Sequence, residues 1–282
     1  MRKSLIFLTA FMVAGCSSLP CWVPALPTRA RPATSQEKLV NEPNVAPIVF
    51  IADYASEAIE ATGGMNVWMN TERLTLDGVV TVYEPNDSFY LTEHHFEVFP
   101  WSNSITISAD EPLNRFVWQF SAGQFATLQG DDKKDVAPKP ISYRDYAQAV
   151  LWIITAPMRL VDESADFTKS PEAVKIQGQW YYPIEQTRSI RPDGLGQQNE
   201  ESAIPNQAQP YWSKVVFFQN NNSSIVDMIF FAKVDQNKFL AVRGYDYKEV
   251  VENGVLVPTR VEIFRTDARA VTEERLVKID FH

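Results

Sequence analysis

Apolar and polar residues alternate along two long stretches of the chain, one before and one after its middle. The first stretch contains five such runs, at Leu74–Tyr83, Phe89–Phe99, Ser104–Ser108, Arg115–Phe120 and Gln124–Leu128. The second contains seven, at Ala173–Ile176, Trp180–Thr187, Trp212–Gln219, Ile225–Lys233, Phe239–Val250, Val257–Arg265 and Glu274–Phe281. Successive side chains of a strand point to opposite faces, so each run predicts a strand with one face toward a core. Turn residues separate the runs, which indicates two antiparallel meanders.

Two other segments have the three- and four-residue spacing of helices. Apolar residues recur in this way from Ile48 to Thr62, and Gly63-Gly64 follows as a stop signal. The segment Tyr143–Leu160 is apolar on most sides, which predicts a largely buried helix between the meanders. We expect this second helix to plug or cover a curved sheet.

Two polar, proline-containing segments interrupt these patterns. Residues 16–47 hold six prolines and no sustained apolar pattern, so we expect an extended tether. The stretch Ser189–Pro210 is long for a loop inside a compact domain, and such loops are either functional or disordered. The predicted organisation is therefore a signal segment at 1–15, a tether at 16–47 and one domain at 48–282.

The first sixteen residues have the layout of a secretory signal. A basic head, Met1-Arg2-Lys3, precedes an apolar run from Leu5 to Val13, which is about half the length needed to span a bilayer. The last four residues, Val13-Ala14-Gly15-Cys16, resemble the lipobox of bacterial lipoproteins. That resemblance implies thioether lipidation of Cys16, cleavage before it, N-acylation of the new terminus, with palmitate among the acyl groups, and attachment to a membrane. The alternatives are a plain cleaved signal peptide and an uncleaved anchor.

Charge and cysteine content limit the partners of the domain. The chain carries a formal net charge of −9; residues 1–47 contribute +3, from five basic and two acidic side chains, and the remaining −12 falls on residues 48–282. An acidic body is a poor partner for nucleic acid and for anionic lipid headgroups, so membrane attachment must come from the lipid. With Cys16 acylated, Cys21 has no partner for an intramolecular disulfide.

No familiar catalytic or cofactor motif is present, and we expect neither enzymatic activity nor a cofactor. The sharpest local cluster is Glu93-His94-His95-Phe96-Glu97. On a strand, Glu93, His95 and Glu97 would share one face, but at about 6–7 Å spacing, which is wide for one metal ion. We interpret them as a solvated polar face beside a buried Phe96. The carboxylate pairs at 131–132 and 273–274, and a Ser-x-x-Lys match at 35–38, have no features of a catalytic site.

Aromatic residues, 12% of the chain, are the more informative feature. A curved sheet would bring many of them to its concave face, where they either fill a core or line a cavity for an apolar molecule. Six are candidate ligand-binding residues: Trp118, Phe120, Trp152, Trp180, Trp212 and Phe230.

The order of the predicted elements resembles the LolA/LolB-like superfamily of envelope lipoprotein carriers. The resemblance rests on the helix ending in Gly63-Gly64, Trp68 shortly after it, the two meanders around a helical insertion, and the segment 253–262, Asn-Gly-Val-Leu-Val-Pro-Thr-Arg-Val-Glu. It implies an α+β, mostly β fold: a curved antiparallel half-barrel with an N-terminal helix and a central helical lid or plug, around an apolar cavity for acyl chains.

The sequence thus predicts a lipid-anchored cell-envelope lipoprotein whose body binds an acyl chain or lipidated peptide without chemistry. Ser17 follows Cys16 where an aspartate favours retention in the inner membrane, so the family rule points to the outer membrane, facing the periplasm. The alternative is a structural or scaffolding lipoprotein that docks to an envelope protein and fills its core with its own side chains. A hydrolase that acts at the envelope is the third candidate, and the sequence shows no nucleophile and base to support it.

Overall fold

The computed structural model describes residues 51–85, 88–111, 114–130, 140–162, 165–188, 211–249 and 254–282. Residues Val49–His282 form one compact unit. Cys16, Cys21, the tether at 16–47 and the loop at 189–210 lie outside the described residues.

The first meander follows two short helices. The N-terminal elements are α1 (Asp53–Glu60), α2 (Met65–Met69), β1 (Leu74–Tyr83), β2 (Phe89–Phe99), β3 (Ser104–Glu111), β4 (Asn114–Ser121) and β5 (Gln124–Gln129). The boundaries of β1 and β2 agree with the predicted runs at both ends. The first helix is shorter than predicted, because it begins at Asp53 rather than Ile48, and α2 was not predicted.

Two helical segments separate the meanders, α3 (Tyr143–Ile154) and α4 (Ala156–Arg159). A single helix over Tyr143–Leu160 was expected, and that prediction is wrong at Thr155, where the helix breaks. Pro157 explains the break, since it has no N–H and its ring would clash with the carbonyl of Ile153 in a continuous helix. Ser142 caps α3: its Oγ accepts from the Asp145 N–H at 3.2 Å.

The second meander contains the remaining strands. They are β6 (Ala165–Lys169), β7 (Val174–Ile176), β8 (Gln179–Arg188), β9 (Lys214–Asn220), β10 (Val226–Lys233), β11 (Lys238–Glu249), β12 (Leu256–Thr266) and β13 (Thr272–Phe281), with a 3-10 turn, η1 (Val234–Gln236), before β11. Strand β6 was missed by the sequence patterns. The expected hairpin at Asn220-Asn221-Asn222 joins β9 and β10.

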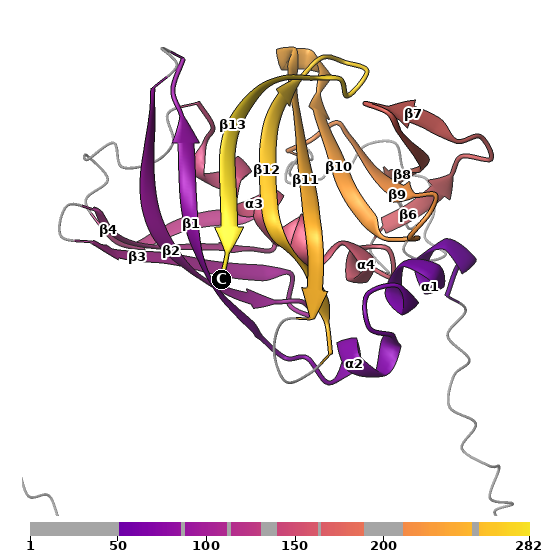
Figure 1. Ribbon diagram of the computed structural model, residues 1–282, viewed down its shortest axis with the longest axis horizontal. Coiled ribbons are helices and arrows are strands. Elements are labelled where there is room, and N and C mark those ends of the chain that lie inside the picture. The colour runs from indigo at the N-terminus through magenta and orange to yellow at the C-terminus, as the bar shows by residue number, and fades with distance from the viewer. Residues whose placement is uncertain are drawn as a thin grey trace, which may run out of the picture. The chain divides into compact units, whose positions relative to one another are not determined.

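Within the described residues, all thirteen strands belong to one antiparallel sheet. The order is β5-β4-β3-β2-β1-β13-β12-β11-β10-β9-β8-β6, and β7 pairs with β8. The two meanders meet where β1 pairs with β13, from Gly78 opposite Phe281 to Val82 opposite Val277. The sheet is curved and open, and its outer strands, β5 and β6, do not pair with each other. The predicted mostly β, curved antiparallel architecture is confirmed (Figure 1).

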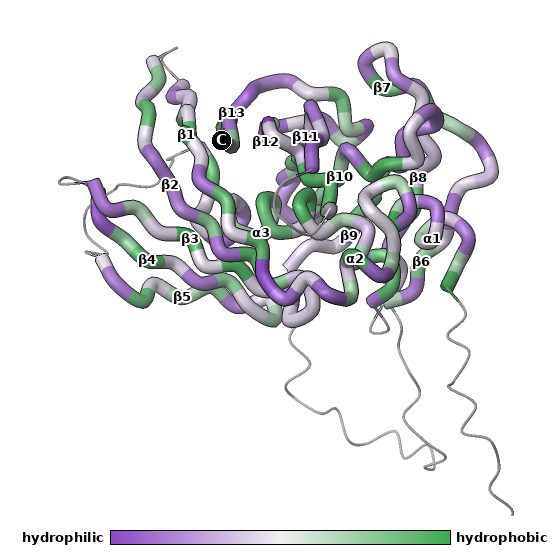
Figure 2. Tube along the Cα trace, turned by 60° about the horizontal axis from the view of Figure 1, so that its bottom comes forward, coloured by the Kyte–Doolittle hydropathy of each residue, from purple (hydrophilic) through white to green (hydrophobic). Residues whose placement is uncertain are grey.

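Helix α3 lies on the concave side of this sheet, where it contacts strands of both meanders: β3, β4 and β5 on one side, and β10, β11 and β12 on the other. The sheet curves around it, and the helix is coloured largely hydrophobic (Figure 2). Every residue of α3 from Asp145 to Ile154 is buried. Burying one large aliphatic side chain contributes about 1.5–3 kcal/mol, so α3 is a major part of the core and fills the concave face as a plug.

Both faces of the sheet are apolar over β8–β11. The main core contains Phe217, Ile229 and Phe231 with α3, whereas alternate residues, including Phe218 and Phe230, form a second cluster on the other face. The uninterrupted apolar runs in β9 and β10 are the sequence signal of this two-sided burial.

Glycine at position 63 is required by the way α1 meets the second meander. Gly63 has φ +119°, and a Cβ there would lie 2.5 Å from the carbonyl oxygen of Gly254. Beside it, the N–H of Leu256 donates to the Thr62 carbonyl at 3.0 Å, and Trp68 Nε1 donates to Thr62 Oγ1 at 3.0 Å. These contacts bring together Gly63, Trp68 and the segment that begins at Gly254, residues on which the sequence resemblance rests.

Candidate functional site

The six candidate aromatic residues do not form one site. Trp118, Phe120, Trp152 and Trp212 are buried in the main core with α3. Phe230 is buried in the second cluster, on the opposite face of the sheet, and Trp180 is 49% exposed. The structure therefore brings four of the six to the concave side.

Those four divide further between the two sides of α3. Trp118 stacks on Phe116 and on Tyr143, with ring centroids 3.6 and 4.6 Å apart. Trp152 and Trp212 both lie against Phe231, at 5.5 and 5.4 Å. The second group borders open space.

That open space is a pocket of about 480 Å³ between α3 and strands β8 and β9. Its lining residues are Gly123, Arg144, Gln148, Trp152, Glu185, Gln186, Thr187, Tyr211, Trp212, Ser213, Lys214 and Val215. We call this space the α3 pocket. Its volume lies in the range of small-molecule sites, about 300–1,000 Å³.

Three lining residues come from one face of α3. Arg144, Gln148 and Trp152 are four residues apart, so they follow one another along the helix. Gln148 Oε1 accepts a hydrogen bond from Trp212 Nε1 at 3.1 Å, which fixes the indole of Trp212 against the helix. The buried side chains of Trp152, Trp212 and Val215 give the pocket an apolar floor.

Positive charge gathers around Tyr211 at the same pocket. The guanidinium of Arg144 lies 3.8 Å from the centre of the Tyr211 ring, and the ammonium groups of Lys233 and Lys238 lie 4.6 and 5.7 Å from it. Lys238 also forms an ion pair with the fully buried carboxylate of Asp145. Cation–π contacts of this kind hold cations without neutralising them.

The Glu93–Glu97 cluster is divided between the two faces of β2, as predicted. His95 pairs with Asp77 at 2.7 Å and Glu97 with Arg73 at 3.0 Å, both partly exposed. Among the residues that the structure describes, no group of three or more His, Cys, Asp or Glu side chains could hold a metal ion.

His94, on the other face of β2, is buried in the main core, a role that the sequence patterns did not assign. Its Nδ1 and the Tyr146 hydroxyl of α3 lie 3.0 Å apart and share a hydrogen bond. Burial lowers the pKa of His94 from 6.5 to about 3 and raises that of Tyr146 well above its ordinary value. The pair is therefore neutral, and it links β2 to α3.

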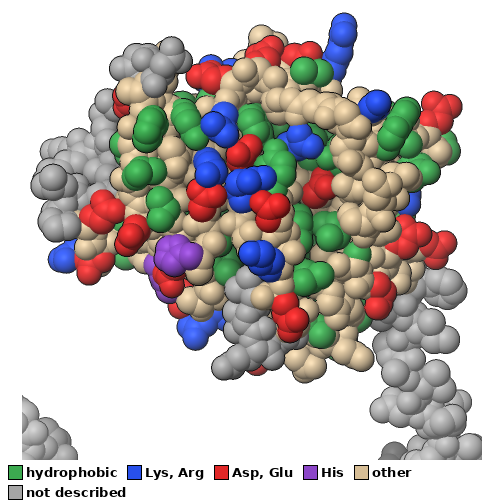
Figure 3. All heavy atoms as spheres, in the orientation of Figure 1, with side chains coloured by type: hydrophobic (Ala, Val, Ile, Leu, Met, Phe, Trp, Pro, Cys, Tyr) green, Lys and Arg blue, Asp and Glu red, His purple; other side chains and the backbone are tan. Residues whose placement is uncertain are grey.

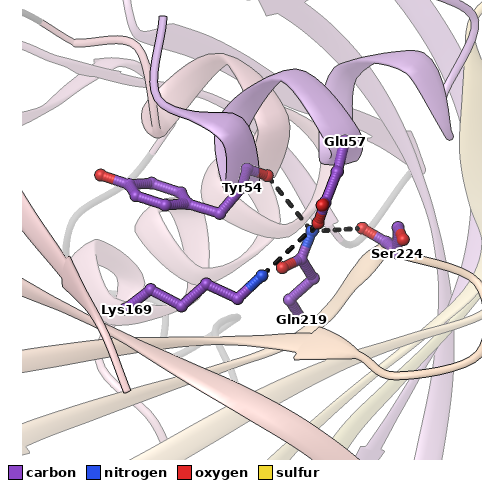
Figure 4. Close-up of polar contacts among 5 residues, drawn as sticks. All are labelled: Tyr54, Glu57, Lys169, Gln219 and Ser224. Carbon is purple, nitrogen blue, oxygen red and sulfur yellow. Dashed lines mark hydrogen bonds and ion pairs between the residues drawn. The ribbon is translucent and has the colours of Figure 1, made fainter. Parts of the chain in front are cut away.

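A second pocket, of about 520 Å³, is polar and lies beside α1. The buried Gln219 of β9 donates from Nε2 to the Tyr54 and Ser224 carbonyls, both at 3.2 Å, and to Glu57 at 3.4 Å (Figure 4). Lys169 pairs with the same carboxylate at 3.4 Å. These contacts fasten α1 to the β9–β10 hairpin, which is a structural role.

No described helix is long and apolar enough to cross a membrane.

Comparisons with known proteins find similarity only at the level of solved structures. No family model matches the chain, and no curated protein matches its sequence. A LolA superfamily protein from Nitrosomonas europaea is similar with 11% identity and a TM-score of 0.49, over 81% of this chain and 90% of that one. A DUF1329 family protein from Desulfovibrio piger is similar with 12% identity and a TM-score of 0.42, over 81% of this chain and 90% of that one. An outer membrane lipoprotein-sorting protein domain from Vibrio parahaemolyticus is similar with 9% identity and a TM-score of 0.41, over 81% of this chain and 88% of that one. These similarities do not assign the chain to a family.

Proposed function

We propose that this protein is a lipid-anchored lipoprotein of the cell envelope that holds an apolar chain in the α3 pocket without catalysing a reaction. The observation that carries the proposal is the pocket itself, with its floor of Trp152, Trp212 and Val215. Sites for small molecules are concavities in which an apolar surface is combined with placed polar groups, and the α3 pocket combines its apolar floor with the polar side chains of α3, β8 and β9.

The anchor and the location rest on the sequence. The segment Val13-Ala14-Gly15-Cys16 supports lipidation of Cys16, and Ser17 supports the periplasmic face of the outer membrane. One acyl chain gives only marginal attachment, so the several chains of a lipoprotein anchor are needed to hold the protein permanently. We expect a Cys16→Ser variant to leave the membrane fraction or to remain unprocessed; mature protein still in that fraction would contradict the anchor.

Native mass spectrometry of the body, residues 48–282, purified from cells tests ligand binding. We expect a co-purifying lipid on the unmodified body. Val215→Trp places an indole in the pocket and should exclude the lipid, whereas Val174→Trp, at a partly exposed position of β7, is the matched control and should retain it. A body that is always empty, and that fails to bind a fluorescent fatty acid, would contradict the proposal.

The alternative is a scaffolding lipoprotein whose body docks to an envelope protein. The burial of α3 favours it, since that helix already fills the concave face of the sheet. An empty body in the experiment above would support this second function.

A further inference from the structure

The α3 pocket contains hydrogen-bond donors for which the described part of the chain supplies no acceptor. Arg144 Nε and Trp152 Nε1 are buried, and neither has a hydrogen-bond partner among the described residues. Both side chains line the pocket and belong to the same face of α3. A buried donor without a partner is costly, and Arg144 Nε is satisfied most simply by a ligand that brings an acceptor atom into the pocket.

The charges at the pocket indicate which kind of acceptor this is. Two nearby lysines are neutralised by carboxylates: Lys214 pairs with Glu185 at 2.9 Å, and Lys238 pairs with Asp145. Arg144 forms no ion pair with any described residue. It donates from Nη2 to the carbonyl of Gly123 at 2.6 Å and lies over the Tyr211 ring.

Lys233 adds to this positive charge, since it also lies over Tyr211 and forms no ion pair within the described ranges. The charged lining residues Arg144, Lys214 and Glu185 sum to +1, with Lys233 over the same ring but outside the lining, on a body whose residues 48–282 sum to −12. A guanidinium with a free N–H binds a carboxylate or phosphate with charge-assisted hydrogen bonds, which are stronger than neutral ones.

From this geometry we infer that the α3 pocket binds a single-chain amphiphile with an anionic head, a carboxylate or a phosphate. The head lies at Arg144, and the chain lies on Trp152, Trp212 and Val215. The volume of about 480 Å³ suits one chain rather than several. This inference rests on the proposed function and names the class of ligand that the pocket selects.

A displacement assay separates the inference from the function on which it rests. The body, residues 48–282, contains all the described helices and strands and forms one compact unit. It is loaded with the uncharged fluorophore N-phenylnaphthylamine, which is then displaced by laurate, lauryl phosphate, dodecanol or dodecyltrimethylammonium below their micellar concentrations. We expect either anion to displace the probe at a concentration at least about tenfold lower than dodecanol, and the cation to be the weakest, because one charge-assisted hydrogen bond is worth about a factor of ten or more.

Arg144→Gln tests the position of the head. This substitution should lower the affinity for laurate about tenfold and leave the affinity for dodecanol unchanged. Arg144→Lys should keep a preference for the anion. Lys175→Gln is the matched control: Lys175 also lies over an aromatic ring, that of Trp180 at 5.8 Å, but it does not line the α3 pocket, so its removal should preserve the preference. Melting curves establish that each variant is folded.

The outcomes are distinct. Failure of the body to bind the fluorophore and all four amphiphiles overturns the proposed function together with the inference. Binding with equal affinity for laurate, lauryl phosphate and dodecanol leaves the proposed function in place and overturns the inference, as does a preference for anions that survives in Arg144→Gln. Comparison of laurate with lauryl phosphate shows which of the two heads is the natural one.

Discussion

The outer face of β11–β13 and the α3 pocket both contain basic side chains, but these side chains have different partners in the two regions. On the outer face, basic side chains alternate with acidic ones (Figure 3). Arg275 pairs with Glu262 at 3.1 Å, Lys278 with Asp280 at 2.7 Å and Arg260 with Asp246 at 3.3 Å. At the pocket, Arg144 and Lys233 lie over the ring of Tyr211 and form no ion pair with a described residue, whereas Arg275 and Arg260 lie over tyrosine rings and are also ion-paired.

This difference separates a solvated surface from a site. In ion pairs at the surface the two charges cancel each other, and each pair contributes only about 0–1 kcal/mol to stability. Cations held by an aromatic ring beside an apolar cavity keep their charge available for a ligand. The position of a charge relative to the sheet, rather than the number of charges, therefore distinguishes the two regions.

The largest expected effect distinguishes a tryptophan of the α3 pocket from a solvent-exposed tryptophan of β8. Trp152→Ala removes a side chain that packs on Phe217 and Phe231, and it should lower the free energy of unfolding by about 3–5 kcal/mol. Trp180→Ala, at a half-exposed position, should change it by less than about 1 kcal/mol. Urea unfolding of both variants measures the difference, and equal losses would contradict the assignment of Trp152 to the core.

An intermediate effect is expected when one ion pair of each region is broken. Lys238→Met leaves the fully buried carboxylate of Asp145 without its cation, which should destabilise the body by about 2–3 kcal/mol. Arg260→Met breaks the pair with the exposed Asp246 on the outer face and should cost about 1 kcal/mol or less, with a smaller cost in high salt. Similar costs, measured by urea unfolding at low and high salt, would show that the two regions do not differ as described.

The smallest effect concerns His94, which is buried on one face of β2. Burial holds the pKa of His94 at about 3, below its ordinary 6.5, so the unfolded chain binds more protons between these values. Stability from this group is complete above pH 6.5 and is lost as pH falls toward 3. The free energy of unfolding should therefore fall by roughly 1.5 kcal/mol between pH 6.5 and pH 5 through His94 alone.

Unfolding measured at both pH values checks this prediction. His94→Gln should reduce the dependence on pH. An unchanged dependence in His94→Gln would contradict the neutral, buried state of His94.

The sequence predicts the strands of this fold better than its site. Alternation places β1 and β2 at their observed boundaries, because one face of each strand is buried and the other is solvated. The same rule is less informative in β9 and β10, where both faces are buried, and Phe230 therefore faces the second cluster rather than α3.

The pocket depends on distant segments that no local pattern brings together. Arg144 belongs to α3, Tyr211 precedes β9, and Gly123 lies in the turn between β4 and β5. Only the fold places these three residues side by side. The spacing of Arg144, Gln148 and Trp152 along one helix face was visible in the sequence as a polar and aromatic stripe on a largely apolar helix. The stripe becomes part of a pocket only because the fold places Trp212 and Tyr211 against it.

A crystal structure of the body with a fatty acid that carries bromine at its methyl end tests the central claim most directly. We predict anomalous density for bromine beside Trp152, Trp212 and Val215, with the carboxylate within hydrogen-bonding distance of Arg144. Bromine on the exposed apolar residues of β2, Phe89 and Leu91, with an empty α3 pocket, would contradict the account.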